Sequence, residues 1–332
     1  MNDPRIFKTL SIDGGGIKGI YSAQILAHLE AEFDCHIADY FDLLCGTSTG
    51  GLIALALSLR IPASDVVSFY REHKDIIFPQ IGCVRAWWDQ YVGSGKYDNT
   101  ALRRSLKDVF GDKRLGDSES LLCIPSYTLD GNRPWIFKFD HEEGDLKRHN
   151  NTKYVDVALA TSAAPTYFPI VKIEEHEGHR FIDGGVYANN PSPIVLTEAF
   201  THFVGPEKDF DYLKILSIAS VETNDIGLSH SRKRLSARHW RKDLLKPFSV
   251  GQSHIAHFML TQFTKHEMLP CDYHRIRSPH LSPEEKKHIG MDKADDRAVK
   301  VLLSKANDIG HLQRAEPAVR VFFDHKKLYK TN

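Results

Sequence analysis

The stretch from Tyr40 to Leu59, Y-F-D-L-L-C-G-T-S-T-G-G-L-I-A-L-A-L-S-L, limits how this chain can fold. Its apolar first part has the composition of a strand, and its uncharged Leu/Ala-rich last part has that of a buried helix. A sharp turn at G-T-S-T-G, residues 46–50, must join them, and a side chain in place of either glycine would collide with strand or helix. This pattern is typical of a nucleophile elbow that exposes a serine, here Ser48. A plain glycine and serine turn explains the five residues equally well when they are taken alone.

The beginning of the chain shows the same order of elements. Residues 7–12 have strand character, residues 13–19 form the loop D-G-G-G-I-K-G, and residues 20–33 carry apolar side chains at helical spacing. Two successive units of this kind predict a parallel sheet whose loops gather at the carboxyl ends of its strands. Further strands are expected at residues 121–129, 135–139, 181–186 and 212–219, and further helices at residues 66–77, 99–110, 154–164, 191–203, 252–264 and 293–307, the last with Gly310 as its C-terminal glycine.

Composition indicates a folded chain without a strong overall charge. The 332 residues are 42% hydrophobic and 26% charged, which excludes an intrinsically disordered protein. Lys+Arg and Asp+Glu number 43 each, so no whole-chain field attracts a nucleic-acid polymer. Charged residues interrupt the first apolar segment, and the longest uncharged run, residues 43–59, is short for a bilayer, so neither a signal peptide nor a transmembrane helix is expected. The scattered cysteines predict reduced thiols in a cytoplasmic protein; they are Cys35, Cys45, Cys83, Cys123 and Cys271.

Two irregular segments leave their roles open. Residues 78–95 contain Trp87 and Trp88, whose side chains suit either a packed core or a lid that faces lipid. The basic stretch from Arg232 to Lys246 contains Asp243 as its single acid. It is either a solvated helix face or a surface for an anion or a membrane.

The glycine-rich loop fits two kinds of site. Taken literally, Gly14-x-Gly16-x-x-Gly19 between a strand and a helix is a dinucleotide-binding fingerprint, which predicts a nicotinamide or flavin oxidoreductase. That interpretation leaves the G-T-S-T-G turn without a purpose and needs neither Gly15 nor Lys18. An oxyanion hole uses both loops, because backbone N–H groups unobstructed by side chains can point at a carbonyl oxygen that becomes negative. Adjacent strand and helix units would bring the two loops together.

A serine nucleophile also needs a base. Asp183 is placed at the end of a predicted strand and directly before Gly184 and Gly185, which keep space around its carboxylate clear. Such a carboxylate could accept a serine proton directly, although a plain turn residue is the alternative. The histidines of the C-terminal third could complete a Ser-His-Asp triad, but none has a glycine-rich setting at a strand end; they are His254, His257, His266, His274 and His280.

Four motifs, in this order, are similar to those of the patatin-like phospholipase family. They are D-G-G-G-I-K-G (residues 13–19), G-T-S-T-G (46–50), A-T-S-A-A-P-T-Y-F-P (160–169) and D-G-G-V-Y-A-N-N-P (183–191), and the resemblance covers about residues 7–219. It implies a Ser-Asp dyad without histidine, with Ser48 as nucleophile and Asp183 as base. It further implies that a loop of glycines supplies oxyanion N–H groups and that Lys18 contacts a substrate phosphate. The implied oxyanion glycines are Gly14, Gly15 and Gly16, and the other motif glycines are Gly19, Gly46, Gly50, Gly184 and Gly185.

The expected fold is therefore α/β, a three-layer sandwich with a mainly parallel central sheet and a helical C-terminal extension. Residues 1–332 are expected to form one patatin-like phospholipase domain, with a catalytic core at about 7–221 and a basic, helical extension at about 222–332. The implied reaction releases a fatty acid from a glycerophospholipid at a membrane surface, through an acyl-enzyme and without a cofactor. A non-catalytic lipid-binding module is a further alternative.

In outline the chain is also similar to bacterial patatin-like effectors that cyclic dinucleotides switch on in antiviral defence. This resemblance implies a cyclic dinucleotide activator and degradation of the cell's own membrane, with the enzyme peripheral at the inner membrane when active. A homo-oligomer is compatible with this resemblance. No metal is expected, because His254-x-x-His257 and Cys271-x-x-His274 have zinc-like spacings but neither an H-E-x-x-H motif nor a second C-x-x-C accompanies them.

Overall fold

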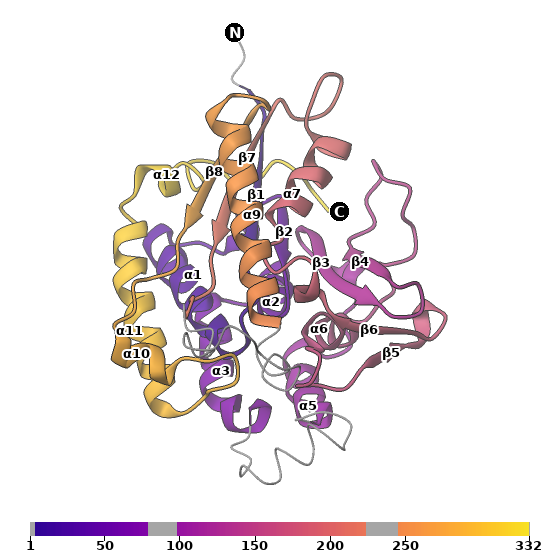
Figure 1. The fold of residues 1–332 in the computed structure, drawn as a ribbon. Helices are drawn as coiled ribbons and strands as arrows, with labels where there is room; N and C mark the ends of the chain where they lie inside the picture. Colours follow the sequence, from indigo (N-terminus) through magenta and orange to yellow (C-terminus); the bar gives the residue numbers. More distant parts are fainter. Residues whose placement is uncertain (1–3, 79–97, 224–244, 332) are drawn as a thin grey trace, which may run out of the picture.

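The computed structural model describes residues 4–78, 98–223 and 245–331 and is built around an eight-stranded sheet (Figure 1). The strand order is β5-β6-β3-β2-β1-β7-β8, with β4 paired to β3 beside this path. Pairing is parallel from β3 through β2, β1 and β7 to β8, and antiparallel among β3, β4, β5 and β6. The strands are β1 (Ile6–Ile12), β2 (Leu43–Gly46), β3 (Leu121–Thr128), β4 (Arg133–Lys138), β5 (Val171–Ile173), β6 (His179–Asp183), β7 (Tyr212–Ile218) and β8 (Cys271–Ile276).

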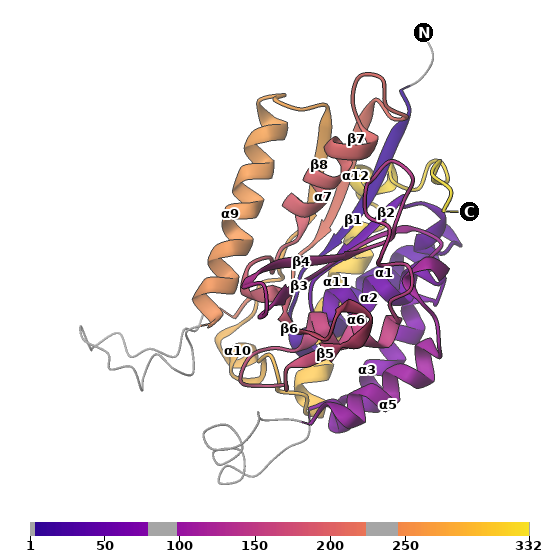
Figure 2. The ribbon, with the colours of Figure 1, turned by 90° about the vertical axis from the view of Figure 1, so that its right-hand side faces the viewer.

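Helices cover both faces of this sheet, as Figure 2 shows from the side. One face is covered by α7 and α9, and the other by a larger group that includes α1, α2, α3 and α11. The helices are α1 (Gly19–Phe33), α2 (Thr49–Ser58), α3 (Ala63–Ile77), α5 (Asn99–Phe110), α6 (Tyr154–Ser162), α7 (Ser192–Glu198), α9 (Leu245–Lys265), α10 (Pro283–His288), α11 (Asp296–Gln313) and α12 (Pro317–Arg320). The expected three-layer α/β fold with a mainly parallel sheet is confirmed. Among the described helices, none combines the length and the apolar character needed to cross a membrane.

The central strands are buried because helices exclude water from both of their faces. All four residues of β2 are buried, and so are six of the seven residues of β1. A strand in this position does not show the strict alternation of buried and exposed side chains that a half-exposed strand shows. The runs F-K-T-L-S-I and L-L-C-G therefore identified the two strands that precede the glycine loop and the serine turn.

The sequence analysis predicted helices in the C-terminal part but did not predict β8. The segment C-D-Y-H-R-I has mixed polarity, and it lies at the edge of the sheet, parallel to β7. The expected boundary near residue 221 falls between these two neighbouring strands. We infer that the whole chain forms one domain, because its last third completes the sheet that its first part begins.

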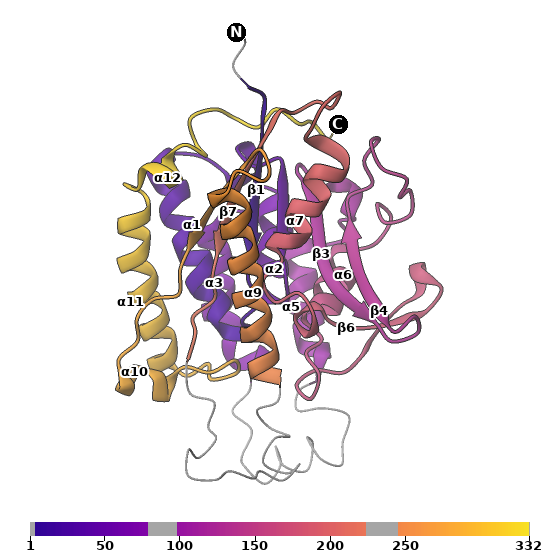
Figure 3. The ribbon, with the colours of Figure 1, turned by 45° about the horizontal axis from the view of Figure 1, so that its top comes forward.

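Gly310 does not end the helix that precedes it. Helix α11 continues to Gln313, and it lies side by side with α1 (Figure 3). A Cβ atom on Gly310 would come within 2.5 Å of the His28 ring in α1. The prediction that Gly310 ends the helix was wrong. The lack of a side chain at Gly310 instead permits α1 and α11 to approach closely.

Strand β8 also completes a buried ion pair. Arg275 donates two hydrogen bonds to Asp13, from Nη1 to Oδ1 at 3.0 Å and from Nη2 to Oδ2 at 2.5 Å. The two side chains expose only 5% and 3% of their surface. Asp13 is the first residue of the glycine loop, which follows β1. Arg275 therefore anchors this loop from β8, although β7 lies between β1 and β8 in the sheet.

We predict that Arg275→Ala lowers the free energy of unfolding by about 3–5 kcal/mol, because it leaves the Asp13 carboxylate buried without its partner. Urea unfolding measures this change. Arg5→Ala is the matched control: its guanidinium contacts Asp209 at 3.2 Å with both groups exposed, and it should cost about 1 kcal/mol or less. Equal losses for the two variants would contradict the role assigned to the buried pair.

Candidate active site

The predicted turn between strand and helix is present at Ser48. Strand β2 ends at Gly46, helix α2 begins at Thr49, and Ser48 between them has φ 56° and ψ −123°. A Cβ atom on Gly46 would lie 2.0 Å from the carbonyl oxygen of Gly50. A Cβ atom on Gly50 would lie 2.4 Å from the carbonyl oxygen of Ile12. Only glycine fits at these two positions, as the sequence suggested.

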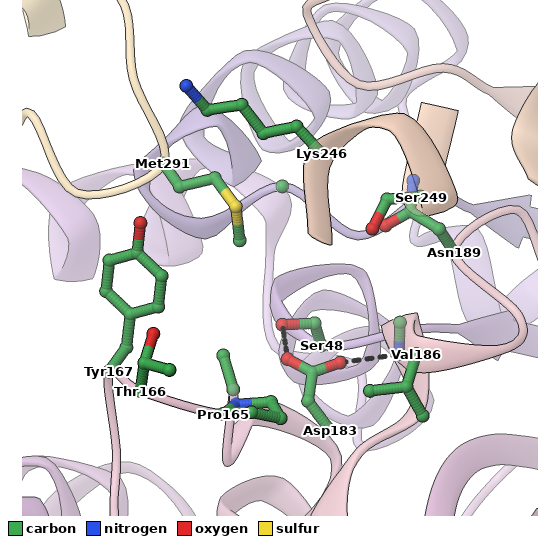
Figure 4. Close-up of a pocket in the computed structure, with 13 residues that line it drawn as sticks. Ser48, Pro165, Thr166, Tyr167, Asp183, Val186, Asn189, Lys246, Ser249 and Met291 are labelled. Atoms are coloured by element: carbon green, nitrogen blue, oxygen red, sulfur yellow. Dashed lines mark hydrogen bonds between the residues drawn. The ribbon is translucent and has the colours of Figure 1, made fainter. Parts of the chain in front are cut away.

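The Ser48 hydroxyl lies against the carboxylate of Asp183, the last residue of β6 (Figure 4). Ser48 Oγ donates a hydrogen bond of 2.6 Å to Oδ2, and the Gly185 N–H donates one of 2.6 Å to Oδ1. Ser48 and Asp183 are only 6% and 4% exposed. Burial raises the pKa of Asp183 to about 6, although the hydrogen bonds from Ser48 and Gly185 lower it. The carboxylate is therefore a stronger base than an ordinary aspartate.

Strand β3 brings the two side chains together. It pairs with β2 at Cys45 and Cys123, one residue before the turn, and with β6 at Ser126 and Asp183. Since β6 is antiparallel to β3, the end of β6 returns to the edge where β2 ends. The sequence could place both residues at strand ends, but it could not show this antiparallel return.

A threonine that the sequence analysis quoted but did not interpret holds the turn in place. The Ser48 N–H donates to Thr161 Oγ1 at 3.0 Å, and this hydroxyl donates to the carbonyl of Pro125 at 2.6 Å. Thr161 belongs to the motif at residues 160–169. Thr161 could thus have been found from the sequence, because it lies within one of the four motifs.

The glycine loop lies beside Ser48, as expected for neighbouring units. Gly15 and Gly16 each line a pocket that also contains Ser48. The Gly14 N–H donates to the carbonyl of Asn189 at 3.0 Å, and the Gly15 N–H donates to the Thr49 hydroxyl at 3.2 Å. Gly16 has φ 61°, in the left-handed region that favours glycine. The three glycines therefore lie near Ser48 but do not have the same hydrogen-bond partners, and their role in an oxyanion hole stays a prediction.

The remaining predicted residues have structural contacts. The ammonium group of Lys18 donates to the carbonyl of Val221 at 2.8 Å, and burial lowers its pKa to about 8. Lys18 does not line the pockets described next, so its contact with a phosphate stays a prediction. A Cβ atom on Gly19 would lie 2.9 Å from the Tyr70 hydroxyl, and one on Gly184 would lie 2.4 Å from a backbone carbonyl oxygen.

Two pockets meet at Ser48. The first has Ser48 and Asp183 at its floor and a mixed polar and apolar wall (Figure 4). The second is almost entirely apolar. Its apolar lining consists of Leu52, Tyr70, Ile77, Phe78, Leu102, Ala164, Tyr167, Phe168 and Met291.

Three residues of the C-terminal part, Lys246, Ser249 and Met291, line the first pocket, and their position there could not be predicted from the sequence. Met291 lines both pockets, and its carbonyl accepts the Ile17 N–H of the glycine loop at 2.9 Å. Lys246, in the first turn of α9, stands at the rim of the first pocket (Figure 4). The rest of the basic stretch, and the Trp87-Trp88 pair, lie outside the described residues.

Comparison with known proteins identifies the class to which this site belongs. The family model described as patatin-like phospholipase matches residues 10–196. The chain therefore belongs to the patatin-like phospholipase family and is a lipid-hydrolysing serine hydrolase. This result overturns the dinucleotide-dependent oxidoreductase as an explanation of the glycine loop.

Two bacterial relatives match nearly the whole chain. A protein of Pseudomonas aeruginosa described as a cGAMP-activated phospholipase is 29% identical over 324 residues, which cover 96% of this chain and 92% of that protein. One of Escherichia coli with the same description is 30% identical over 336 residues, which cover 95% and 92%. Among solved structures, human GIVD cytosolic phospholipase A2 has a TM-score of 0.43 and 12% identity, covering 97% of this chain and 60% of that one.

Proposed function

We propose that the chain hydrolyses acyl esters of glycerophospholipids with a Ser48–Asp183 dyad. The observation that carries this proposal is the 2.6 Å hydrogen bond from the Ser48 hydroxyl to a buried carboxylate at the junction of two pockets. No histidine takes part in that hydrogen bond. Asp183 is therefore the group that can accept the serine proton directly.

In the first half of the reaction Ser48 Oγ attacks the ester carbonyl carbon while its proton passes to Asp183 Oδ2. The raised pKa of Asp183 favours this transfer, because a base with a pKa near the working pH accepts a proton most effectively. The tetrahedral intermediate then expels the lysophospholipid alkoxide. Asp183 returns the proton to this leaving group, and an acyl-enzyme remains on Ser48.

In the second half a water molecule attacks the acyl carbonyl and Asp183 takes a proton from it. Ser48 leaves with that proton, and the free fatty acid is the second product. In both halves a carbonyl oxygen becomes negative and needs N–H donors. Gly16 suits this role best: it lines a pocket with Ser48, whereas the Gly14 N–H already donates to Asn189 and the Gly15 N–H to the Thr49 hydroxyl.

The second pocket supplies the lipid specificity. Its aliphatic and aromatic walls would bury an acyl chain, and each buried methylene contributes about 0.8 kcal/mol. The first pocket, with its polar wall and Lys246 at the rim, would then face the glycerophosphate part. We place the enzyme at a membrane surface, where such a substrate is found.

Products released from mixed phospholipid vesicles test the dyad. We expect mass spectrometry to find free fatty acid and lysophospholipid with the unmodified protein. Ser48→Ala and Asp183→Asn should each reduce the rate by about 10⁴-fold or more, because each removes one member of the reacting pair. Correctly folded variants that keep normal turnover would exclude the dyad. Liposome binding without any product would instead support the non-catalytic lipid-binding alternative.

The pH dependence of kcat/KM tests the assignment of Asp183 as base. The active form is the carboxylate, and its pKa is raised to about 6 by burial. We therefore expect kcat/KM to be level above about pH 7 and to fall about tenfold per pH unit below pH 6. A soluble short-chain ester avoids the titration of lipid headgroups. A rate that is constant from pH 8 down to pH 4.5 would contradict the assignment.

We further propose that a cyclic dinucleotide activates the enzyme, in a role related to antiviral defence. Support comes from the two bacterial relatives described as cGAMP-activated phospholipases, which match more than nine-tenths of this chain. It also comes from charge, because the basic stretch ends at Lys246 on the rim of the pocket. A dianionic nucleotide bound by this stretch would act next to the place where the substrate enters.

Fatty-acid release with and without a panel of cyclic dinucleotides, including cGAMP, tests this activation. We expect at least one nucleotide to raise the rate by about tenfold or more, as a coupling free energy of 1–3 kcal/mol allows. A linear dinucleotide of the same charge is the control. Equal rates with every nucleotide would remove the activator proposal and leave the hydrolase proposal intact.

A further inference from the structure

Three metal-ligating side chains meet at a place that the proposed reaction does not use. They are His141, in the turn after β4, Glu198, the last residue of α7, and His202, in the π-helical turn Ala199–Phe203. One ligand atom from each lies within 4.8 Å of the others. His141 and Glu198 side chains are 6% and 7% exposed, and His202 is half-buried.

This cluster lies away from the Ser48 turn. The ring of Phe203, next to His202, stacks on Phe7 with centroids 4.8 Å apart. Phe7 is near the beginning of β1, whereas Ser48 follows the end of β2, which is parallel to β1. Helix α7 thus connects the two regions without bringing them into contact. Any ligand of the cluster would act on the fold and not on the reacting ester.

Both imidazole rings are oriented by Glu143. The Nδ1 atom of His141 lies 3.2 Å from its carboxylate, and the Nδ1 atom of His202 lies 3.2 Å from its backbone carbonyl oxygen. Both of these oxygens accept hydrogen bonds, so the tautomer inferred for each ring carries its proton on Nδ1. The Nε2 lone pairs are then available for a metal. Metal-ligating histidines usually show this pattern of outer hydrogen bonds.

The remaining contacts keep this arrangement in place. The Tyr329 hydroxyl donates to the Glu143 carboxylate at 3.0 Å. The ammonium of Lys147 donates to the carbonyl of His141 at 2.9 Å. The Gly144 backbone passes so close to the His141 ring that a Cβ atom there would lie 2.8 Å from it. The orientation of His141 is therefore fixed by the fold before any ligand binds.

The spacing between His141 and Glu198 suits a metal ion better than a strong hydrogen bond. His141 Nε2 and Glu198 Oε1 are 3.3 Å apart, and a charge-assisted hydrogen bond is usually about 2.7–2.9 Å. Two ligands at about 2.0–2.1 Å from a zinc ion, at a tetrahedral angle, are about 3.3–3.4 Å apart. An ion could therefore bridge these two atoms with little movement, whereas the ligand atom of His202, which lies within 4.8 Å of them, would have to come closer.

Lys138 affects the site in two ways. Its ammonium pairs with the second oxygen of Glu198, which leaves Oε1 as the oxygen that faces the histidines. The ion pair with the Lys138 ammonium stabilises the charged form of Glu198 although its side chain is buried. Glu198 is thus a carboxylate that can bind a metal through one oxygen. The positive charge of Lys138 also weakens the binding of any cation.

We propose that His141 Nε2, Glu198 Oε1 and His202 Nε2 form a binding site for a divalent transition-metal ion, with zinc as the best fit. Imidazole ligands favour zinc and its neighbours over Mg²⁺ and Ca²⁺, which prefer oxygen. Three protein ligands leave a fourth position, on the half-buried side of His202. The ion would fix the turn after β4 against the end of α7. The site could not be predicted from the sequence, because His141 is far from the other two ligands in the chain.

Zinc binding to the untagged full chain tests this site. The chain is first stripped of metal with EDTA, then incubated with Zn²⁺ and freed of excess zinc by gel filtration. We expect one Zn²⁺ per chain by elemental analysis and a thermal midpoint several degrees higher than that of the metal-free chain, because the ion binds the native state. Mg²⁺ and Ca²⁺ at the same concentration should cause no shift. His141→Gln and His202→Gln should each weaken binding by at least about tenfold, because even changes to the outer shell of a metal site cost 10–100-fold.

His254→Gln is the matched control, since His254 Nε2 contacts Glu222 at the same distance of 3.3 Å on the exposed surface. It should leave zinc binding unchanged. Co²⁺ substitution in the unmodified protein does not depend on the folding of variants, and it should give the strong visible absorption of a four- or five-coordinate ion. No bound zinc, a weak octahedral Co²⁺ spectrum, or equal loss in His254→Gln and His202→Gln would overturn the proposal. None of these outcomes bears on ester hydrolysis.

Discussion

The backbone conformation of Ser48 is the constraint on which the rest of the site depends. A non-glycine residue at φ 56° and ψ −123° is strained by about 1–3 kcal/mol. The fold sustains this strain because Gly46 and Gly50 have no side chains and because the Ser48 N–H is bonded to Thr161. The turn directs the hydroxyl out of the sheet edge and toward Asp183. A hydroxyl and a carboxylate separated by 135 positions in the sequence thus form one buried hydrogen bond.

The C-terminal third of the chain holds the other side of this site. Arg275 of β8 anchors Asp13 at the start of the glycine loop, and the Met291 carbonyl accepts an N–H from the same loop. Ser253 of α9 bonds to both Asp13 and Asn189. Helix α9 begins at the pocket rim and reaches this buried network along its length. The position of the glycine loop therefore depends on elements that lie outside the family motifs.

Local patterns predicted much of the fold and singled out Ser48 and Asp183, whose side chains the structure brings together. Strand β1, the glycine loop, helix α1 and the turn at Ser48 each have a steric or periodic signature within a few residues, and the ordered motifs identified Asp183. What depended on distant contacts was not predictable. Strand β8 has mixed polarity because it is an edge strand, and Gly310 serves a helix contact that its neighbours in sequence do not reveal. The cluster of His141, Glu198 and His202 likewise exists only after folding.

The most direct test of the central claim is labelling with a fluorophosphonate probe, which reacts with activated serine hydroxyls, followed by peptide mapping. The account predicts one labelled residue, Ser48, in a protein that contains many serines. Labelling should be lost in Asp183→Asn, because the buried carboxylate is the group that activates the hydroxyl. Label on another serine, or equal labelling of Ser48 in Asp183→Asn, would contradict a dyad that works without histidine.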